Sequence, residues 1–200
     1  MGKEFSTEQF KKLISFAAGL TKVMFFGTII FGSLFIMAGI VVLILDRDWF
    51  TVTEAMMGSL TFDFNSAVEI NASELIDQDI NLKSVVLATC FSIPVIFGLV
   101  AVILHYLSRI LSSLKDNTPF TNENVKSLKV IAWSIIISSV LVPAVETFIF
   151  TMIIHSTGIE QLDSVFSIDL TALFVGFLLL ILSHIFNYGT YLQKEYDQTL

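Results

Sequence analysis

Four long apolar runs constrain the fold of this chain more than any other feature of its sequence. Each is about as long as the roughly 20 helical residues that cross a bilayer, and none contains Lys or Arg. Because backbone groups inside a bilayer must bond within the protein, each run predicts a helix. The sequence therefore predicts an all-α integral membrane protein. We expect a single domain over residues 1–200 that forms a four-transmembrane-helix bundle. The predicted spans are residues 23–45, 85–107, 130–154 and 170–191.

The composition supports a membrane protein and excludes several other classes. Hydrophobic residues make up 54% of the chain and charged residues 14%, whereas a soluble domain carries about 25% charged residues. The net charge of −7 does not suit a nucleic-acid-binding protein, which needs a clustered basic face. We therefore expect contact with the lipid bilayer and no direct contact with nucleic acid.

The distribution of Lys and Arg predicts the orientation in the membrane. Segments 1–22, 108–129 and 192–200 together contain nine of these residues, whereas segments 46–84 and 155–169 contain two. Short cytoplasmic loops are enriched in Lys and Arg. We therefore place both termini and the 108–129 loop in the cytoplasm and the other two loops outside.

Two segments next to the first span carry further patterns. Residues 7–20 have apolar side chains at spacings of three and four, which predicts an interfacial helix on the membrane surface. A simple extension of the first span explains the same pattern. The outer loop 46–84 is too long for a mere connection, and apolar and polar residues alternate over 60–65 and 68–71. This alternation predicts a small extracytoplasmic cap with a β-hairpin.

The inner loop has the features of a defined turn between two helices. Pro119 ends any preceding helix, and Thr121 is suited to cap the next one. Phe120 before the cap and Val125 after it have the spacing of a hydrophobic staple. Leu128 continues the apolar face into the third span. We therefore expect a hinge between two helices that project into the cytoplasm.

Two segments resemble a known family. The inner loop has Pro119-Phe120, a polar cap, and a helix start of the form Asn-Val-x-x-Leu from Asn124 to Leu128. The C-terminal segment has a glycine, then Leu-Gln, two acids, a threonine and a final apolar residue. These are Gly189, Leu192, Gln193, Glu195, Asp197, Thr199 and Leu200. Both segments resemble the bacterial membrane family called domain of unknown function 2975, or YoaS-like, and the resemblance covers nearly the whole chain.

The resemblance implies four helices in the bacterial cytoplasmic membrane and no established activity. Members are often encoded beside a small helix-turn-helix regulator, which implies a cytoplasmic regulatory partner. The candidate residues for docking this partner are those of the two cytoplasmic motifs: Pro119, Phe120, Asn124, Leu128, Gly189, Leu192, Glu195 and Asp197.

Glu146 is the unusual residue of the third span. A carboxylate deep in a bilayer costs several kcal/mol, about +2.5 to +3.5 for Asp on insertion scales. Pro143 one turn earlier and Pro94 in the second span each free a backbone carbonyl, so the three predict an intramembrane polar site. One interpretation is a proton, cation or sensing site. The other is a neutral acid that satisfies a backbone group at a kink or bonds a neighbouring helix.

The remaining polar residues do not indicate an enzyme. No nucleophile elbow, metalloprotease motif, phosphate loop or dinucleotide fingerprint is present. His105, His155 and His184 do not have metal-ligand spacing, although the first and last lie at the same end of their spans. We therefore expect no enzymatic activity, no cofactor and no metal site.

Small residues form a stripe on the first span. Thr28, Gly32 and Gly39 allow close helix packing. The stripe fits packing inside the bundle, and it also fits a dimer seam, which leaves a homo-oligomer open.

Three functions follow from these patterns. The first is a regulatory or sensory membrane protein that docks a cytoplasmic partner, with a helix-turn-helix transcription regulator as the candidate. The second is an accessory subunit of a membrane complex. The third is a small proton or cation transporter subunit that uses Glu146.

Overall fold

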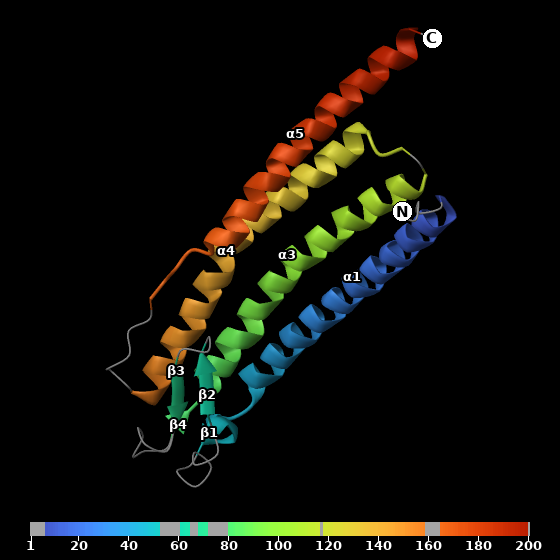
Figure 1. The fold of residues 1–200 in the computed structure, drawn as a ribbon. Helices are drawn as coiled ribbons and strands as arrows, with labels where there is room; N and C mark the ends of the chain where they lie inside the picture. Colours follow the sequence, from blue (N-terminus) through green and yellow to red (C-terminus); the bar gives the residue numbers. More distant parts are fainter. Residues whose placement is uncertain are drawn as a thin grey trace, which may run out of the picture. The chain divides into compact units, whose positions relative to one another are not determined.

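The structure, a computed structural model, confirms the four predicted spans as four long helices (Figure 1). It describes residues 7–52, 61–64, 68–71, 80–116, 118–158 and 165–199. Each of the four helices is long and apolar enough to cross a membrane. They are α1 (Thr7–Ile44), α3 (Lys83–Lys115), α4 (Asn122–Thr157) and α5 (Leu170–Thr199).

The helices are longer than the apolar runs that predicted them. α4 has 36 residues, or about 54 Å at 1.5 Å per residue, whereas the hydrocarbon core of a bilayer is about 30 Å thick. The helix α1 has 38 residues and includes the 7–20 segment without a break. That segment is therefore continuous with the first span, and its position on the membrane surface stays a prediction.

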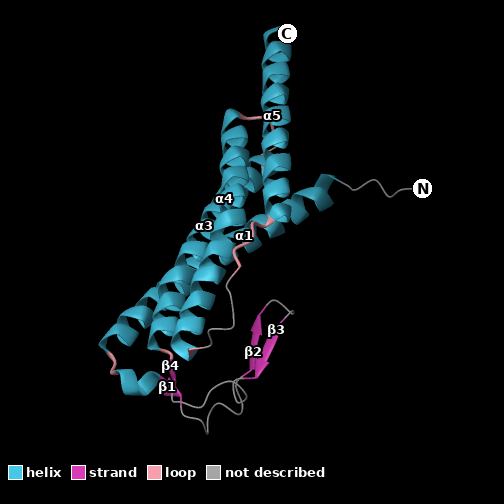
Figure 2. Cartoon of the chain, turned by 90° about the vertical axis from the view of Figure 1, so that its left-hand side faces the viewer, coloured by secondary structure: helices cyan, strands magenta, loops and turns pink. Residues whose placement is uncertain are grey.

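Short elements connect α1 to α3. The 3₁₀ helix η1 (Arg47–Phe50) follows α1 and leads into β1 (Thr51–Val52), which pairs antiparallel with β4 (Ile80–Asn81). Two further strands, β2 (Thr61–Phe64) and β3 (Val68–Asn71), form a second antiparallel pair with Phe62 opposite Ile70 (Figure 2). The predicted alternating runs coincide with this pair, and the residues between its strands lie outside the described part of the chain.

The chain forms two compact units. Unit 1 comprises residues 1–33, 95–143 and 167–200, and unit 2 comprises residues 34–94 and 144–166. Both chain ends and the α3–α4 connection belong to unit 1. By sequence, unit 1 has nine Lys and Arg against seven acids, whereas unit 2 has two against eleven. The excess negative charge of the protein therefore belongs entirely to unit 2.

In unit 1, α4 and α5 pack closely because small residues lie at their contact. A Cβ atom placed on Gly176 would lie 2.5 Å from the Ile136 Cγ1 atom and 3.1 Å from the Ala132 carbonyl oxygen. Ala132 is completely buried. α5 begins beside α4 at Asp169, whose backbone N–H donates to the Ser139 carbonyl oxygen at 2.9 Å. The core of the unit is centred on Ile110, Leu128 and Ile131.

Both glycines of the predicted stripe on the first span pack against α3. In unit 1, a Cβ atom placed on Gly32 would lie 3.5 Å from the Phe97 Cβ atom. In unit 2, a Cβ atom placed on Gly39 would lie 3.1 Å from the nearest side-chain atoms of Cys90 and Phe91. Cys90 is buried. The stripe therefore serves packing within the chain, the first of its two interpretations.

In unit 2, polar groups tie the end of α1 to the start of α3. The Lys83 ammonium donates to the Leu45 carbonyl oxygen at 2.5 Å and to the Leu43 carbonyl oxygen at 3.4 Å. The Asn81 side-chain amide donates to the Arg47 carbonyl oxygen at 2.8 Å. The Lys83 ammonium therefore satisfies carbonyls at the end of α1, where helix carbonyls lack partners within their own helix.

Candidate functional site

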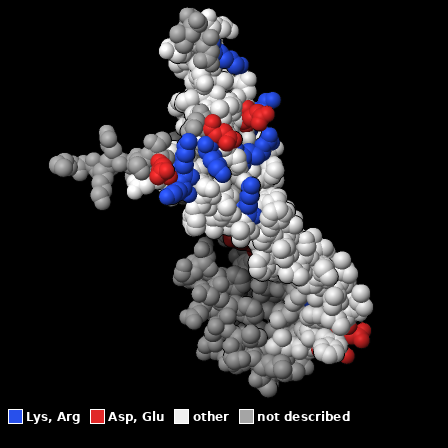
Figure 3. All heavy atoms as spheres, turned by 90° about the vertical axis from the view of Figure 1, so that its right-hand side faces the viewer, with Lys and Arg blue, Asp and Glu red and all other residues white. Residues whose placement is uncertain are grey.

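Lys and Arg side chains gather on unit 1. On the face drawn in Figure 3, Lys and Arg form a cluster with a few acids among them, while a broad stretch of the described surface carries neither. Among the described residues the one ion pair is Arg109–Glu123, at 3.5 Å, and its side chains are 50% and 79% exposed. An exposed pair of this kind contributes only about 0–1 kcal/mol. The cluster is therefore available for interaction with molecules outside the chain.

The α3–α4 connection is held by one buried amide. The Asn124 side chain is 2% exposed, and its amide donates to the Ser113 hydroxyl and to the Pro119 carbonyl oxygen, both at 2.8 Å. The Ser113 hydroxyl in turn donates to the Thr118 carbonyl oxygen at 2.5 Å. Asn124 therefore joins the end of α3, the connection and the start of α4 in a single network.

The predicted cap of α4 is present. The Asn124 backbone N–H donates to the Thr121 hydroxyl oxygen at 3.2 Å, which satisfies one of the free donors at the helix start. Val125 is buried. The sequence pattern therefore identified the helix start correctly, and the cap fixes where the connection ends.

Phe120 anchors the connection against α5. Its ring lies 5.3 Å from the ring of Phe186, and a Cβ atom placed on Gly189 would lie 2.7 Å from its Cδ1 atom. Only glycine at position 189 leaves room for the ring in this position. The sequence predicted a staple with Val125, whereas the contact that the structure describes is with α5.

The end of α5 exposes large side chains. Tyr188, Leu192 and Tyr196 lie four residues apart on one helix face and are 63%, 46% and 66% exposed, and we call them the tail face. Beside this face the Tyr191 hydroxyl donates to the Glu195 carboxylate at 2.5 Å. Ten residues of α5 follow Gly189, or about 15 Å of helix beyond its contact with the connection. The tail face therefore extends past the rest of unit 1.

The eight predicted docking residues divide into two groups. Asn124 and Leu128 are buried, and Gly189 packs against Phe120. These three residues therefore contribute to packing and present little surface to a partner. Exposed surface comes from Phe120, Leu192 and Glu195, and Pro119 is partly exposed. The side chain of Asp197 lies outside the described residues.

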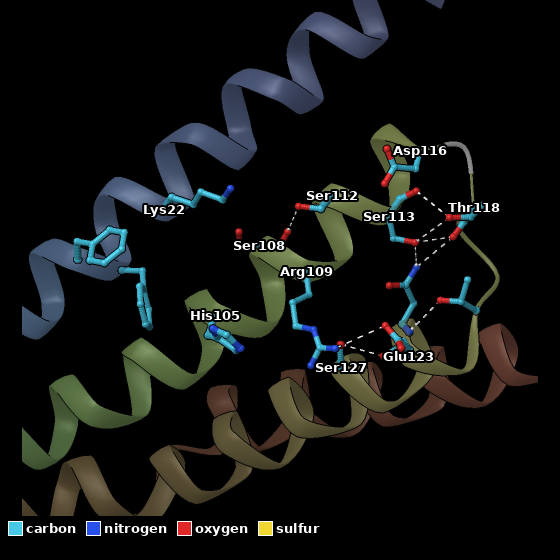
Figure 4. Close-up of a pocket in the computed structure, with 14 residues that line it drawn as sticks. Lys22, His105, Ser108, Arg109, Ser112, Ser113, Asp116, Thr118, Glu123 and Ser127 are labelled. Atoms are coloured by element: carbon cyan, nitrogen blue, oxygen red, sulfur yellow. Dashed lines mark hydrogen bonds and ion pairs between the residues drawn. The ribbon is translucent and has the colours of Figure 1, made fainter.

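A pocket in unit 1 was not predicted from the sequence. It has a volume of about 720 Å³ and is lined by α1, α3 and the start of α4. Figure 4 shows Lys22 of α1 extending toward α3 and Arg109 of α3 extending toward Glu123 of α4, and both line the pocket. Phe25 and Phe26 of α1 line the same space. The available signal was that each of the two cations is the Lys or Arg residue nearest to one end of its apolar run.

The three residues of the predicted intramembrane polar site divide between the units. Glu146 and Pro94 belong to unit 2, and Pro143 belongs to unit 1. Glu146 has an exposed side chain on α4, and both prolines lie inside continuous helices and are partly exposed. The polar site that was predicted from these residues stays a prediction.

The histidines have separate surroundings. The His105 ring lies 5.8 Å from Phe25 and 5.3 Å from Tyr106, and it lines the pocket. His184 is exposed on α5. Within the described ranges, no three His, Cys, Asp or Glu side chains come together in a way that could hold a metal ion.

The fold and the arrangement of charge define a multi-pass membrane protein with four spans. A family model described as "Protein of unknown function (DUF2975)" matches residues 66–200, so the chain belongs to that family. The matched region contains α3, α4 and α5, including the two motifs on which the resemblance was based. No curated protein and no solved structure matches the chain.

Proposed function

We propose that this protein is a regulatory protein of the bacterial cytoplasmic membrane that docks a small cytoplasmic regulator, and that it is not an enzyme. The observation that carries the proposal is the tail face of α5, on which Leu192 and Tyr196 are 46% and 66% exposed. Exposed apolar groups that no lipid covers mark sites of interaction with other proteins.

The position of the tail face supports a protein partner over lipid. Gly189 lies at the level of the polar connection through its contact with Phe120. Tyr196 follows Gly189 by seven residues, or about 10 Å along the helix. Tyr188 fits the aromatic belt at a membrane surface, whereas Leu192 and Tyr196 lie beyond it.

The charge near the tail face supports a basic partner. Glu195 is exposed beside the face, and Asp197 follows it in the sequence. A DNA-binding regulator carries a basic surface, so acids around an apolar patch would steer such a partner and fix its orientation. The partner implied by the family resemblance, a small helix-turn-helix protein, has this chemistry.

The anchored connection supports a docking role as well. Phe120 and Asn124 hold the connection to α5 and to both neighbouring helices, so the connection and the tail face form a preorganised surface. Preorganisation raises affinity because little conformational freedom is lost on binding.

The test is cross-linking in the native membrane, purification through a tag on this chain and identification of the co-purifying proteins by mass spectrometry. A small helix-turn-helix protein is the expected partner. We expect a stoichiometric complex that Leu192→Ser with Tyr196→Ser weakens at least tenfold. Lys194→Gln, on the opposite face of the same helix, is the matched control and should leave binding unchanged.

Three outcomes would contradict the proposal. They are a complex that survives the double substitution, equal loss in the Lys194→Gln control, and the absence of any complex with the wild-type chain. Recovery of a stable membrane complex in place of the regulator would favour an accessory subunit.

The exposed carboxylate of Glu146 favours a second candidate function. An acid on the surface of an apolar span is costly against lipid, so its exposure calls for a covering helix from another subunit. In such an assembly Glu146 would carry protons or cations. Proteoliposomes should then show a flux that Glu146→Gln removes, and a flux that survives this substitution would exclude the role.

A further inference from the structure

The pocket of unit 1 lies where the chain passes from apolar to charged sequence. On α1, Lys22 comes just before the first apolar run, and Phe25 and Phe26 follow within about one turn. On α3, Arg109 comes just after the second run, with His105 one turn before it. Two cations from two helices therefore face one cavity at the level where phospholipid headgroups lie.

The two cations are available to a ligand. Within the described part of the chain Lys22 forms no ion pair, and Arg109 contacts the exposed Glu123 at 3.5 Å and lies 5.9 Å from the centre of the Tyr106 ring. Figure 4 shows Lys22 extending from α1 toward α3 and Arg109 extending from α3 toward Glu123 on α4, and both residues line the pocket. An ammonium and a guanidinium that line one pocket from different helices can each bind a phosphate oxygen.

One part of the pocket wall is apolar and another part is acidic. Phe25 and Phe26 form one part of the wall, and Phe26 is 61% exposed. Asp116 and Glu123 belong to the part near the α3–α4 connection. An apolar wall on the membrane side suits the glycerol backbone and the first acyl carbons of a lipid, while the polar wall suits its headgroup. A free phosphate in water would gain nothing from the two phenylalanines.

The balance of charge selects the headgroup. Lys22 and Arg109 contribute two positive charges and Asp116 and Glu123 two negative charges, so the lining is neutral when His105 is neutral. A neutral pocket of mixed sign fits a zwitterion better than an anion, because each end of a zwitterion finds an opposite charge.

We propose that this pocket binds a phospholipid of the inner leaflet with an amine headgroup, such as phosphatidylethanolamine. Lys22 and Arg109 hold the phosphate, Glu123 and Asp116 receive the ammonium, and Phe25 and Phe26 contact the glycerol and upper acyl chains.

The test measures which lipids remain on the purified full-length chain. The protein is reconstituted in nanodiscs with equal amounts of phosphatidylethanolamine and phosphatidylglycerol, and retained lipid is counted by native mass spectrometry. We expect preferential retention of phosphatidylethanolamine. Lys22→Gln with Arg109→Gln should lower retention about tenfold or more, the effect expected when hydrogen bonds to charged groups are lost.

Lys115→Gln is the matched control. It removes the same charge from α3 near the same membrane surface, but Lys115 does not line the pocket. Equal losses in the control and in the double variant would show general surface attraction and would overturn the proposal. Glu123→Gln with Asp116→Asn should abolish the preference for the amine lipid while total retention persists.

A second measurement separates the sources of the phosphate. Phosphatidylethanolamine should raise the thermal unfolding temperature of the wild-type chain and not of the double variant. Inorganic phosphate and water-soluble glycerophosphoethanolamine should not compete. Competition by either would assign the pocket to a soluble phosphate compound, and equal retention of both lipids would overturn the headgroup assignment.

Discussion

Replacing Gly189 by Ala tests how the α3–α4 connection is held against α5. The added Cβ atom would lie 2.7 Å from the Phe120 Cδ1 atom and 2.9 Å from its Cε1 atom. Carbon atoms in contact prefer about 3.5–4.0 Å, so the Phe120 ring must move. The ring is 41% exposed, which leaves it some room to do so.

The expected change in the free energy of unfolding is the difference between a cost and a gain. Overpacking costs about 1–3 kcal/mol, and Ala in place of Gly in a helix returns about 1 kcal/mol. Gly189→Ala should therefore destabilise the wild-type chain by about 0–2 kcal/mol. In a Phe120→Ala chain the clash is absent, so the same substitution should stabilise by about 1 kcal/mol.

The assay is a double-mutant cycle on four proteins in detergent, with unfolding followed by circular dichroism. The coupling between the two positions should be about 1–3 kcal/mol. Gly19→Ala on α1 is the control, because a Cβ atom there meets nothing within 4 Å and should only stabilise. Additive effects, to within about 0.5 kcal/mol, would refute the contact between Phe120 and Gly189.

Three further substitutions test other parts of the fold by the same unfolding assay. Gly176→Ala should destabilise by about 1–3 kcal/mol because its Cβ atom meets the Ala132 carbonyl oxygen at 3.1 Å, whereas Gly98→Ala, with open space around it, should not. Asn124→Ala should cost about 2–3 kcal/mol, since it removes two buried hydrogen bonds of 2.8 Å, and a cost below 0.5 kcal/mol would contradict the network. Lys83→Met should cost about 1 kcal/mol through loss of its bonds to the last carbonyls of α1, and an unchanged stability would show that water replaces it.

The spans were predictable because the bilayer imposes one requirement on every residue that crosses it. A run such as 23–45 must be apolar and helical, so hydropathy alone identifies it. The ends of the helices were less predictable. α1 extends back to Thr7 and α3 extends to Lys115, since nothing in the flanking sequences breaks a helix. A pattern of hydropathy reports where lipid ends and not where the helix ends.

The local features of the α3–α4 connection were also predictable. Thr121 caps α4 as its residue type suggests, because a cap depends on a few neighbouring residues. The contact of Phe120 with Gly189 could not be predicted, because Gly189 is 69 residues away in the chain and the contact requires α5 to lie beside α4. The roles of Asn124 and Leu128 changed for the same reason. Both belong to the motif that was predicted to dock a partner, and only the structure shows that they are buried.

The sequence by itself determined that this chain is a four-helix membrane protein, because the bilayer acts on each residue independently of the others. Tertiary structure alone decided which residues share a site. Lys22 and Arg109 are 87 positions apart, and they line one pocket only because α1 and α3 are neighbours in unit 1. The same packing left Leu192 and Tyr196 exposed while it buried Asn124. Such juxtapositions depend on helix contacts that no local pattern encodes.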